Sequence, residues 1–503
     1  MVFQTPLFNR WDFLCIAVLV VLWFALLPLR YDSLPLQIWD ESRLANNALE
    51  MARNGHWLIP TYDGIPDHWN TKPPLLIWQM AGLIRLGFPS LLAVRLPTML
   101  AALITVAMVW AVGRYVVCDR AVAAFASFLL LSSLAFTEIH IARTGDYDVP
   151  MALFILLYSL AFWASLERPR DGTICMRWFA VAVSAVALAV MTKGVAGGLG
   201  LAGVLVLFFI RNRFSVLVAD YRAWLLTLLA LVMCASYYGL RDQYDPGYLE
   251  SAWQNEVSGR FFAVNEGHVA GPEFYIYFLL YNFEPGVILL PLTAISILGD
   301  NRRRRSVVIL CLISTLGILV ILTSSQTKLF WYTTPVLPFL AIASAIGLVD
   351  ALNLINVRAG HLPLRGLLQI ALGLVLALIS ALSLYRNQVI EPSVAAEQGW
   401  YGALFQELKA YGNIEDILVL DNGFEGTSKN YNPVLKFYAD IARADGLRIK
   451  RVTEWTSAAL PEDKIISTCD PDAIPFLDNL PKFLRKGSVH SCIFGRIDRE
   501  SRR

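Results

Sequence analysis

This chain is poor in charge. Only 16% of its 503 residues are Asp, Glu, Lys or Arg, whereas 56% are hydrophobic, and the mean hydropathy is +0.53. That balance leaves too little polar surface for a soluble enzyme. The sequence also lacks an internal repeat, a low-complexity tract and a glycine-rich phosphate-binding loop. A polytopic membrane protein is the class that fits these absences.

Several apolar runs reach the roughly 18 to 20 residues that a helix needs to cross the hydrocarbon core of a bilayer. They predict eleven transmembrane helices, at residues 12–29, 91–113, 121–139, 149–166, 178–192, 194–210, 223–240, 273–298, 306–323, 331–350 and 366–384. The first run has no small-residue cleavage site after it, so we expect a retained helix and not a removed signal peptide. The predicted fold class is a polytopic α-helical membrane protein.

Arginine is concentrated on one side of this predicted bundle. Fifteen arginines lie in the loops on the side of the N-terminus, against five cations in the outer loops that follow the first one. The positive-inside rule then places the N-terminus in the cytoplasm. Because the number of spans is odd, we expect the C-terminus on the outer side. Topology accounts for the arginines, so the net charge of +2 predicts no nucleic-acid partner.

The last part of the chain changes composition and becomes soluble in character. We expect two domains: a membrane domain at 1–385, whose first outer loop covers about 30–90, and a small outer α/β domain at 386–503. The tail has predicted strands at 416–421, 447–452, 464–468 and 489–496 and predicted helices at 432–444 and 471–480. Of the seven cysteines, Cys469 and Cys492 lie in this tail. They form either a disulfide or two free thiols, and their spacing does not decide between these.

Polar residues gather at the predicted outer ends of the spans. The first outer loop carries Asp40, Glu41 and Lys72, and between them an amphipathic helix at 41–53 that Gly55 closes. Such a helix is expected to lie in the plane of the membrane interface. The later outer turns carry Arg143, Asp146, Asp148, Lys193, Glu256, Arg260, His268, Lys328 and Tyr332. Charge at a membrane surface is costly and is usually functional.

A shared outer pocket of acids and cations suits the transfer of a group away from a phosphate. Lys and Arg bind phosphate and stabilise the charge that develops as the bond breaks, and a carboxylate accepts the proton of an acceptor hydroxyl. No nucleotide is available outside the cytoplasm, so we expect a donor carried by a membrane lipid. The cations can neutralise its phosphate, so we predict no cofactor and no metal. A divalent ion at His268 with Glu256 or Glu266 stays open.

These segments resemble a known family. Trp39-Asp40-Glu41, the pattern Gly-x-Trp-x-x-Pro at 55–60 and Lys72-Pro73 look like the first periplasmic loop of the GT-C glycosyltransferases, which use polyprenyl-phosphate sugars. The resemblance is nearest to the bacterial aminoarabinose transferases that modify lipid A and to the protein O-mannosyltransferases. Further matches run through 142–148, 192–194, 256–261 with His268, and Lys328 with Tyr332, Pro335 and Pro338.

The resemblance implies a role for each matching residue. Asp40 would be the base or the group that orients the acceptor, with Glu41 beside it. Asp148 would be the carboxylate of the second loop, with Asp146 as its support. The implied ligands of the donor phosphate are Lys72, Arg260, Lys328 and Arg143, and the implied pocket residues are Tyr332 and His268. The family's inverting chemistry implies one direct displacement.

Each of these residues also has a purely structural interpretation. Asp40, Asp146 and Asp148 could cap the helices that follow them. Lys72 and Arg260 could be interfacial cations. For Lys193, we prefer the interpretation as an interfacial anchor.

The expected function is transfer of one sugar from a polyprenyl phosphate, such as undecaprenyl phosphate, to lipid A or another envelope glycolipid. The expected location is the periplasmic face of a bacterial inner membrane. Protein O-glycosylation and en bloc oligosaccharide transfer are alternatives with the same kind of site. A lipid flippase or transporter is an alternative of a different class. Transporters typically have paired halves and charges near the midplane, and this sequence shows neither.

Overall fold

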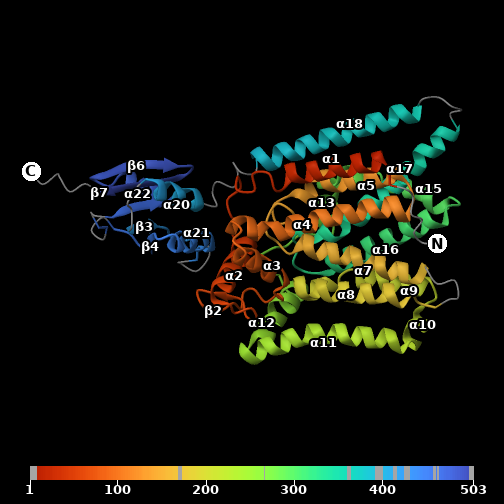
Figure 1. Cartoon of the computed structure of the whole chain (residues 1–503), viewed down its shortest axis with the longest axis horizontal. Coiled ribbons are helices and arrows are strands. Elements are labelled where there is room, and N and C mark those ends of the chain that lie inside the picture. Colours follow the sequence, from red (N-terminus) through yellow and green to blue (C-terminus); the bar gives the residue numbers. More distant parts are fainter. Residues whose placement is uncertain are drawn as a thin grey trace, which may run out of the picture.

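The structure is a computed structural model that describes residues 8–167, 173–264, 267–358, 364–390, 400–411, 416–423, 431–456, 460–461 and 464–497. Glu266, named above as a possible ligand, lies outside these ranges. The chain forms a long helical bundle and a smaller α/β domain at the end of the bundle away from the N-terminus (Figure 1).

Seven helices of the described residues are long and apolar enough to cross a membrane, or eight if a bent pair is one span. The seven are α4 (Ser90–Ala111), α7 (Asp148–Glu167), α8 (Met176–Lys193), α11 (Tyr221–Tyr244), α16 (Arg302–Ser324), α17 (Leu337–Arg358) and α18 (Leu364–Tyr385). Four irregular turns adjoin them: η1 (Val112–Val116), η2 (Gly194–Gly198), η5 (Phe330–Val336) and η6 (Arg386–Ile390). The bent pair, α13 (Phe274–Asn282) followed by α14 (Glu284–Ile288), η4 (Leu290–Leu292) and α15 (Thr293–Leu298), turns by 107°.

All eleven predicted segments contain helix, but, apart from the bent pair, three of the helices have fewer than the roughly 18 residues that a span needs. They are α1 (Arg10–Leu26), with 17 residues, α5 (Arg120–Ser132), with 13, and α9 (Leu201–Ile210), with 10. The short helices α6 (Leu134–Thr137) and α10 (Phe214–Ala219) follow α5 and α9. α9 is short because η2 uses the first part of the apolar run. The count of eleven spans therefore stays a prediction.

α7 lies in the middle of the bundle. Its side chains are buried along almost its whole length, as expected for a helix that is apolar on every side. α4, α8 and α9 pack around it. α11 and α18 lie on opposite outer sides of the bundle (Figure 1). The central position of α7 is relevant to the site because its first residue is Asp148.

The C-terminal domain is a five-stranded mixed sheet with the strand order β4-β3-β5-β7-β6. Its strands are β3 (Asp416–Leu420), β4 (Arg448–Val452), β5 (Ile465–Thr468), β6 (Phe483–Val489) and β7 (Cys492–Ile497), and its helices are α20 (Tyr401–Ala410), α21 (Pro433–Ala444) and α22 (Ala473–Asp478). β3 pairs in parallel with β4 and β5, with Ile417 opposite both Ile449 and Ile465. β7 pairs antiparallel with β5 and β6.

This sheet confirms the predicted strands and helices of the tail, but two elements were missed. β6 is an edge strand whose side chains are mostly exposed, so it lacks the apolar face that marks a strand in a sequence. α20 precedes the first predicted strand and packs on α21. The predicted domain boundary at residue 385 coincides with the end of α18 and stays a prediction.

The first outer loop folds between the bundle and this domain. It consists of α2 (Asp40–Asn54), the two-stranded hairpin of β1 (Thr61–Tyr62) and β2 (Ile65–Pro66), and α3 (Leu75–Arg85). α2 confirms the predicted amphipathic helix, and Gly55 ends it with a left-handed φ of 73°. The later loop contains α12 (Tyr248–Trp253) and the π-helical turn η3 (Gln254–Phe262).

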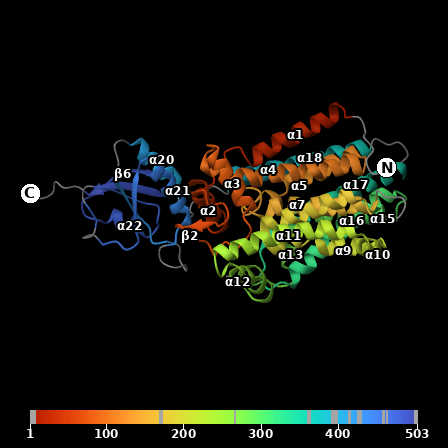
Figure 2. The ribbon, with the colours of Figure 1, turned by 60° about the horizontal axis from the view of Figure 1, so that its bottom comes forward.

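The expected position of α2 in the membrane interface is wrong, because protein covers its apolar face. Leu44, Ala48 and Leu49 are buried in a core that α2 shares with α3 and α21. Both views place α2 between the bundle and the sheet (Figure 1; Figure 2). An amphipathic helix can bury its apolar stripe against any apolar partner, and here that partner is the C-terminal domain.

The tail cysteines form a disulfide between Cys469, after β5, and Cys492, at the start of β7. The two residues are 23 positions apart. Closing a loop of this size restricts the unfolded chain by about 3 kcal/mol. We therefore expect Cys492→Ala to destabilise the C-terminal domain by about that amount, measured as the protease resistance of its β-sheet in urea.

Cys234→Ala is the matched control, because Cys234 is a free thiol on α11. Peptide mapping of the wild-type protein without reductant should recover the Cys469 and Cys492 peptides linked. Recovery of both as alkylated free thiols would contradict this pairing.

Candidate active site

Asp40 begins α2 but does not cap it. The N-cap is Trp39, and no side chain makes a capping hydrogen bond there. Burial opposes the ionisation of Asp40, but nearby cations outweigh this effect and hold its pKa below the usual range. In order of size, these cationic contributions come from Lys72, His140, Arg260 and Lys193. The carboxylate is partly exposed, so an ionised oxygen is available to a substrate.

Asp146 lies beside Asp40 and titrates in the opposite direction. It is buried, and Thr144 Oγ1 donates a hydrogen bond to its carboxylate. Burial and the negative charge of Asp40 raise the pKa of Asp146 well above its usual value. When the environments of two neighbouring carboxyl groups move their pKa values apart, one group carries the charge and the other keeps the proton. Here the charge belongs on Asp40 and the proton on Asp146.

Asp148 forms a buried ion pair with Lys193. Lys193 Nζ lies 2.6 and 2.7 Å from the two carboxylate oxygens, and both side chains are less than a tenth exposed. Nζ also lies 5.0 Å from the centre of the Tyr332 ring. The interpretation of Lys193 as an interfacial anchor is therefore wrong. Its position, alone at the end of an apolar run and just before Gly194, is the sequence signal that distinguishes it from an ordinary interfacial lysine.

Gly194 allows α8 to end against the first outer loop. Its φ is 58°, and a Cβ there would lie 3.2 Å from the Tyr238 hydroxyl and 3.8 Å from Pro73 Cδ. A side chain at this position would be strained and crowded. The glycine thus lets Lys193 reach the same pocket as the Lys72 loop.

Lys72 and Arg260 are the two cations best placed for a phosphate. Lys72 Nζ lies 3.2 Å from Glu256 Oε1, which also accepts a hydrogen bond of 3.1 Å from Thr71 Oγ1. Arg260 Nη1 donates to the Tyr332 hydroxyl. Burial opposes the ionisation of Glu256, but Lys72 and Arg260 lower its pKa overall. Glu256, considered above as a possible metal ligand, instead pairs with Lys72 and feels the charge of Arg260.

Glu41 and Arg143 connect the segments that surround the site. Glu41 is fully buried and accepts two hydrogen bonds from Arg95, of 2.7 and 2.8 Å. Arg143 Nη1 donates to the carbonyls of Leu26 and Leu27, at 3.1 and 3.3 Å. These contacts favour positioning roles over the predicted catalytic and phosphate-binding ones.

Lys328 and His268 also have contacts that differ from their predicted roles. Lys328 Nζ donates to the backbone carbonyls of Leu322, Thr323 and Ser325, which end α16. Burial lowers the pKa of Lys328. His268 is exposed, and its carbonyl accepts a 3.1 Å hydrogen bond from the Lys328 N–H. These contacts connect the loop that carries Arg260 with the end of α16.

His140 belongs to the site and was missed in the sequence. Its ring stacks on Trp331 with centroids 4.5 Å apart, and Nδ1 lies 3.8 Å from Asp146 Oδ2. Asp40, His140 and Asp146 offer three possible metal ligands within 4.8 Å of one another. That donor set would suit a divalent cation. The expectation that the reaction requires no metal stays a prediction.

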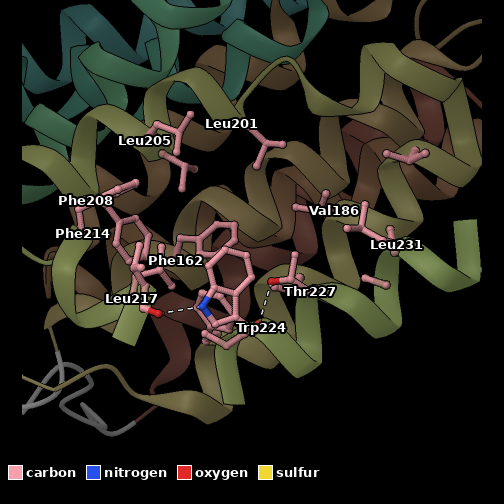
Figure 3. A pocket seen from close by; sticks show the side chains of 18 of the residues that line it. Phe162, Val186, Leu201, Leu205, Phe208, Phe214, Leu217, Trp224, Thr227 and Leu231 are labelled. Carbon is pink, nitrogen blue, oxygen red and sulfur yellow. Dashed lines mark hydrogen bonds between the residues drawn. The ribbon is translucent and has the colours of Figure 1, made fainter. Parts of the chain in front are cut away.

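Two cavities in the bundle differ sharply in chemistry. One, of about 250 Å³, has Lys193, Glu256, Arg260 and Tyr332 at its polar part, and its other lining residues, such as Leu199 and Phe261, are mainly apolar. The other, of about 440 Å³, lies among α7, α8, α9, α10 and α11 and has an almost wholly apolar lining (Figure 3). Its few polar groups bond to the backbone: Trp224 Nε1 to Val218 and Thr227 Oγ1 to Ala223. Only the first cavity combines charge with an apolar groove.

Comparison with known proteins agrees with this geometry. Residues 71–238 match the family described as dolichyl-phosphate-mannose-protein mannosyltransferase. The chain has a TM-score of 0.68 to the crystal structure of ArnT from Cupriavidus metallidurans bound to undecaprenyl phosphate, at 17% identity, covering 97% of this chain and 98% of that one. The chain has the GT-C fold.

Curated proteins with sequence similarity point to the same group. The chain is 29% identical over 359 residues to the undecaprenyl phosphate-alpha-4-amino-4-deoxy-L-arabinose arabinosyl transferase of Pseudomonas savastanoi pv. phaseolicola, covering 69% of this chain and 63% of that protein. It is 27% identical over 348 residues to the transferase of that name from Shewanella sediminis, covering 67% and 60%. The chain thus spans about three fifths of the length of these curated relatives. The expected resemblance to GT-C transferases is confirmed.

The raised pKa of Asp146 predicts how stability depends on pH. Above the ordinary carboxyl pKa the unfolded chain loses this proton while the folded chain keeps it, so stability falls as pH rises toward the folded-state pKa. Asp146→Asn removes this pH-dependent loss of stability. The variant should therefore gain stability relative to wild type between pH 4 and pH 8, at about 1.4 kcal/mol for each unit by which the wild-type pKa is raised.

Thermal unfolding of the detergent-solubilised protein across this pH range is the measurement. Asp32→Asn is the control, because Asp32 is an exposed carboxylate of the first outer loop. Parallel pH curves for wild type and Asp146→Asn would show that Asp146 is ionised in the folded protein.

Proposed function

We propose that this protein transfers a sugar from a polyprenyl phosphate to an envelope glycolipid at the outer face of a bacterial inner membrane. One observation carries the proposal: Arg260 and Glu256 line an apolar groove, Lys72 pairs with Glu256, and the charges of Lys72 and Arg260 keep the nearby carboxylate of Asp40 ionised. A lipid-linked sugar phosphate needs both an apolar groove for its chain and cations for its phosphate. The relatives named as undecaprenyl-phosphate-dependent transferases support this donor class.

In the proposed reaction, an oxygen of the acceptor attacks the anomeric carbon of the donor sugar. The bond from that carbon to the phosphate oxygen breaks, and its electron pair stays on the phosphate. Lys72 and Arg260 stabilise the charge that develops there. The acceptor proton passes to Asp40. One displacement of this kind inverts the anomeric centre. Lys193, which pairs with Asp148, lines the same groove as Arg260.

The lowered pKa of Asp40 favours one acceptor chemistry. A carboxylate with a depressed pKa is a weak proton acceptor, so it works best on a group whose proton leaves easily. A phosphate monoester has a second pKa near 6 and is largely ionised at neutral pH, so a weak base is sufficient for it, whereas an alkyl hydroxyl holds its proton much more strongly. A phosphate on lipid A or a similar glycolipid is therefore a better acceptor than a serine or threonine hydroxyl of a protein.

The proposed orientation follows from the arginine distribution. The N-terminus lies in the cytoplasm, and the C-terminal domain lies in the periplasm. The first outer loop and the C-terminal domain share one end of the bundle (Figure 1), which agrees with a periplasmic site.

Asp40→Asn should abolish most of the transfer without unfolding the protein. Removing a general base lowers kcat by about 10²- to 10⁴-fold, and Asn keeps the shape of Asp at this partly exposed position. The measurement is mass spectrometry of envelope lipids and proteins from cells with wild-type, Asp40→Asn or Asp32→Asn protein. We expect an added sugar mass on a lipid for wild type and Asp32→Asn, and its loss for Asp40→Asn.

The acceptor class is read from the same spectra. An added sugar on protein would move the assignment to protein glycosylation, and a multi-sugar addition would move it to en bloc transfer. Glycoconjugates that are identical with and without the wild-type protein would refute the proposed function and favour a transporter.

Lys72→Ala should weaken use of the donor more than use of the acceptor. A hydrogen bond to a charged group contributes about 1.5–3 kcal/mol, which corresponds to a rise of roughly 10- to 100-fold in the donor KM. The acceptor KM should change less than threefold. Steady-state kinetics with purified donor and lipid A measure both values, with Lys409→Ala, an exposed lysine of the C-terminal domain, as the control. Equal changes in the two KM values would remove the assignment of Lys72 to the donor phosphate.

A further inference from the structure

An aromatic cluster stands at the edge of the candidate site. The rings of Trp39 and Tyr431 are stacked, with centroids 5.8 Å apart and planes inclined by 27°. Tyr62 follows at 6.1 Å from Tyr431. Trp39 comes from the first outer loop and is 38% exposed, whereas Tyr431 comes from the C-terminal domain. The two domains thus present one aromatic surface together.

This surface adjoins the proposed base. Trp39 immediately precedes Asp40, and the charge of Asp40 reaches Tyr431: burial and the charges of Asp67 and Asp40 raise the pKa of Tyr431, against an opposing effect of Arg43. The Trp39 ring and the Asp40 carboxylate thus belong to the same end of α2. Lys72 and Arg260 mark the proposed place of the donor.

Trp39 has an unusual backbone for a bulky residue. Its φ is 74°, in the left-handed region that favours glycine. This conformation costs about 1–3 kcal/mol for a residue with a side chain, and such cost is often found at functional sites. A glycine would remove the strain, but it would also remove the exposed indole beside Asp40.

Tyr431 is held in place by its own domain. The next residue, Asn432, donates from Nδ2 to Asp421 Oδ1 at 2.7 Å and caps α21 by accepting from the Leu435 N–H at 2.9 Å. Gly423, with a φ of 88°, packs against the Tyr431 backbone so closely that a Cβ there would lie 3.1 Å from the Tyr431 carbonyl oxygen. The backbone of Tyr431 is consequently held against β3 and α21.

Arg43 supports the cluster from behind. Its guanidinium lies 3.6 Å from the centre of the Tyr62 ring and makes two hydrogen bonds to Asp67, of 2.7 and 2.8 Å. Because Asp67 neutralises this cation, the exposed face of the cluster is aromatic and not ionic. Exposed aromatic faces bind ligands that are apolar on one side and polar at the rim, which describes the C–H face and hydroxyl rim of a pyranose.

We propose that Trp39 and Tyr431 form a stacking platform for a sugar ring of the acceptor, so that the C-terminal domain completes the acceptor site. This inference rests on the proposed glycosyl transfer and adds to it the part of the acceptor that is recognised. Stacking next to Asp40 would hold a phosphate or hydroxyl on that sugar within reach of the carboxylate. An acceptor without a sugar ring would not stack on this platform.

The alternative for these rings is packing between the domains with no ligand. The two readings differ in what Tyr431→Ala changes. Loss of packing alone alters stability and affects donor and acceptor equally, whereas loss of the platform affects the acceptor selectively. Tyr431→Phe keeps the ring and should behave as wild type under the platform proposal.

The test uses the full-length protein in nanodiscs, with radiolabelled undecaprenyl-phosphate aminoarabinose as donor and lipid A as acceptor. Tyr431→Ala should raise the KM for lipid A by about 3- to 10-fold, the range expected for one lost aromatic contact, with a donor KM within twofold of wild type. Tyr411→Ala is the matched control, because Tyr411 is a half-exposed tyrosine of the same domain that packs on Phe494. It should change neither KM.

A binding measurement separates this proposal from the proposed function. Direct binding of lipid A, and of phosphatidic acid as an anionic lipid without a sugar, is measured for the same variants without donor. We expect Tyr431→Ala to weaken binding of lipid A but not of phosphatidic acid. If Tyr431→Ala weakens lipid A binding in this way but the wild-type protein transfers no sugar, the proposed function is refuted and the platform is supported. Unchanged lipid A binding and KM in a folded Tyr431→Ala protein, or equal loss for both lipids, would overturn the platform while leaving the transfer reaction intact.

Discussion

The buried ion pair between Arg95 and Glu41 is the contact on which the geometry of the site depends. Arg95 projects from α4, and two of its N–H groups donate to Glu41 at 2.7 and 2.8 Å, while the others donate to backbone carbonyls that precede α2. Glu41 also accepts the Gly145 N–H, at 2.9 Å. One pair thus joins the first outer loop, α4 and the second outer loop. Removing either partner would leave an unpaired buried charge, at a cost of about 3–5 kcal/mol. Because Glu41 follows Asp40 directly, this pair sets the distance from Asp40 to Asp146.

Charge in the rest of the site is balanced in the same local manner. Lys193 neutralises Asp148, and Glu256 lies against Lys72, so the pocket collects ionised groups without a large net charge. Burying ions one by one would be prohibitive, whereas burying them in pairs is feasible. The pairs also fix the orientation of each side chain before a substrate arrives, which reduces the reorganisation needed during the reaction. Asp40 differs from these pairs, because several surrounding cations, and no single partner, keep it ionised, while the neighbouring Asp146 holds its proton.

The sequence predicts local features of this protein well and long-range contacts poorly. The helix that Gly55 closes and the strand at Ile465–Thr468 are recognisable because hydrophobic period and turn chemistry are local properties. Residues that face the pocket from the ends of different helices have weak local signatures. His140 has none, and Lys193 differs from an ordinary interfacial lysine only by its position at the end of an apolar run, just before Gly194. The contacts that favour a positioning role for Glu41 are not recognisable in the sequence for the same reason. Its partner Arg95 lies 54 positions away, and nothing in the loop indicates that the two meet.

The position of α2 explains why the soluble domain cannot be treated as an appendage. The N-terminal residue of α2 is Asp40, and its apolar face packs on α21. Polar contacts reinforce this packing: Asn46 Nδ2 donates to the Pro433 carbonyl at 2.8 Å, and Lys436 Nζ lies 3.0 Å from Glu50 Oε1. A shift of the domain would therefore move the helix that carries the proposed base. The predicted boundary near residue 385 does not separate independent packing units, because the core beneath the sheet continues into the first outer loop and includes residues of the helix that begins at Asp40.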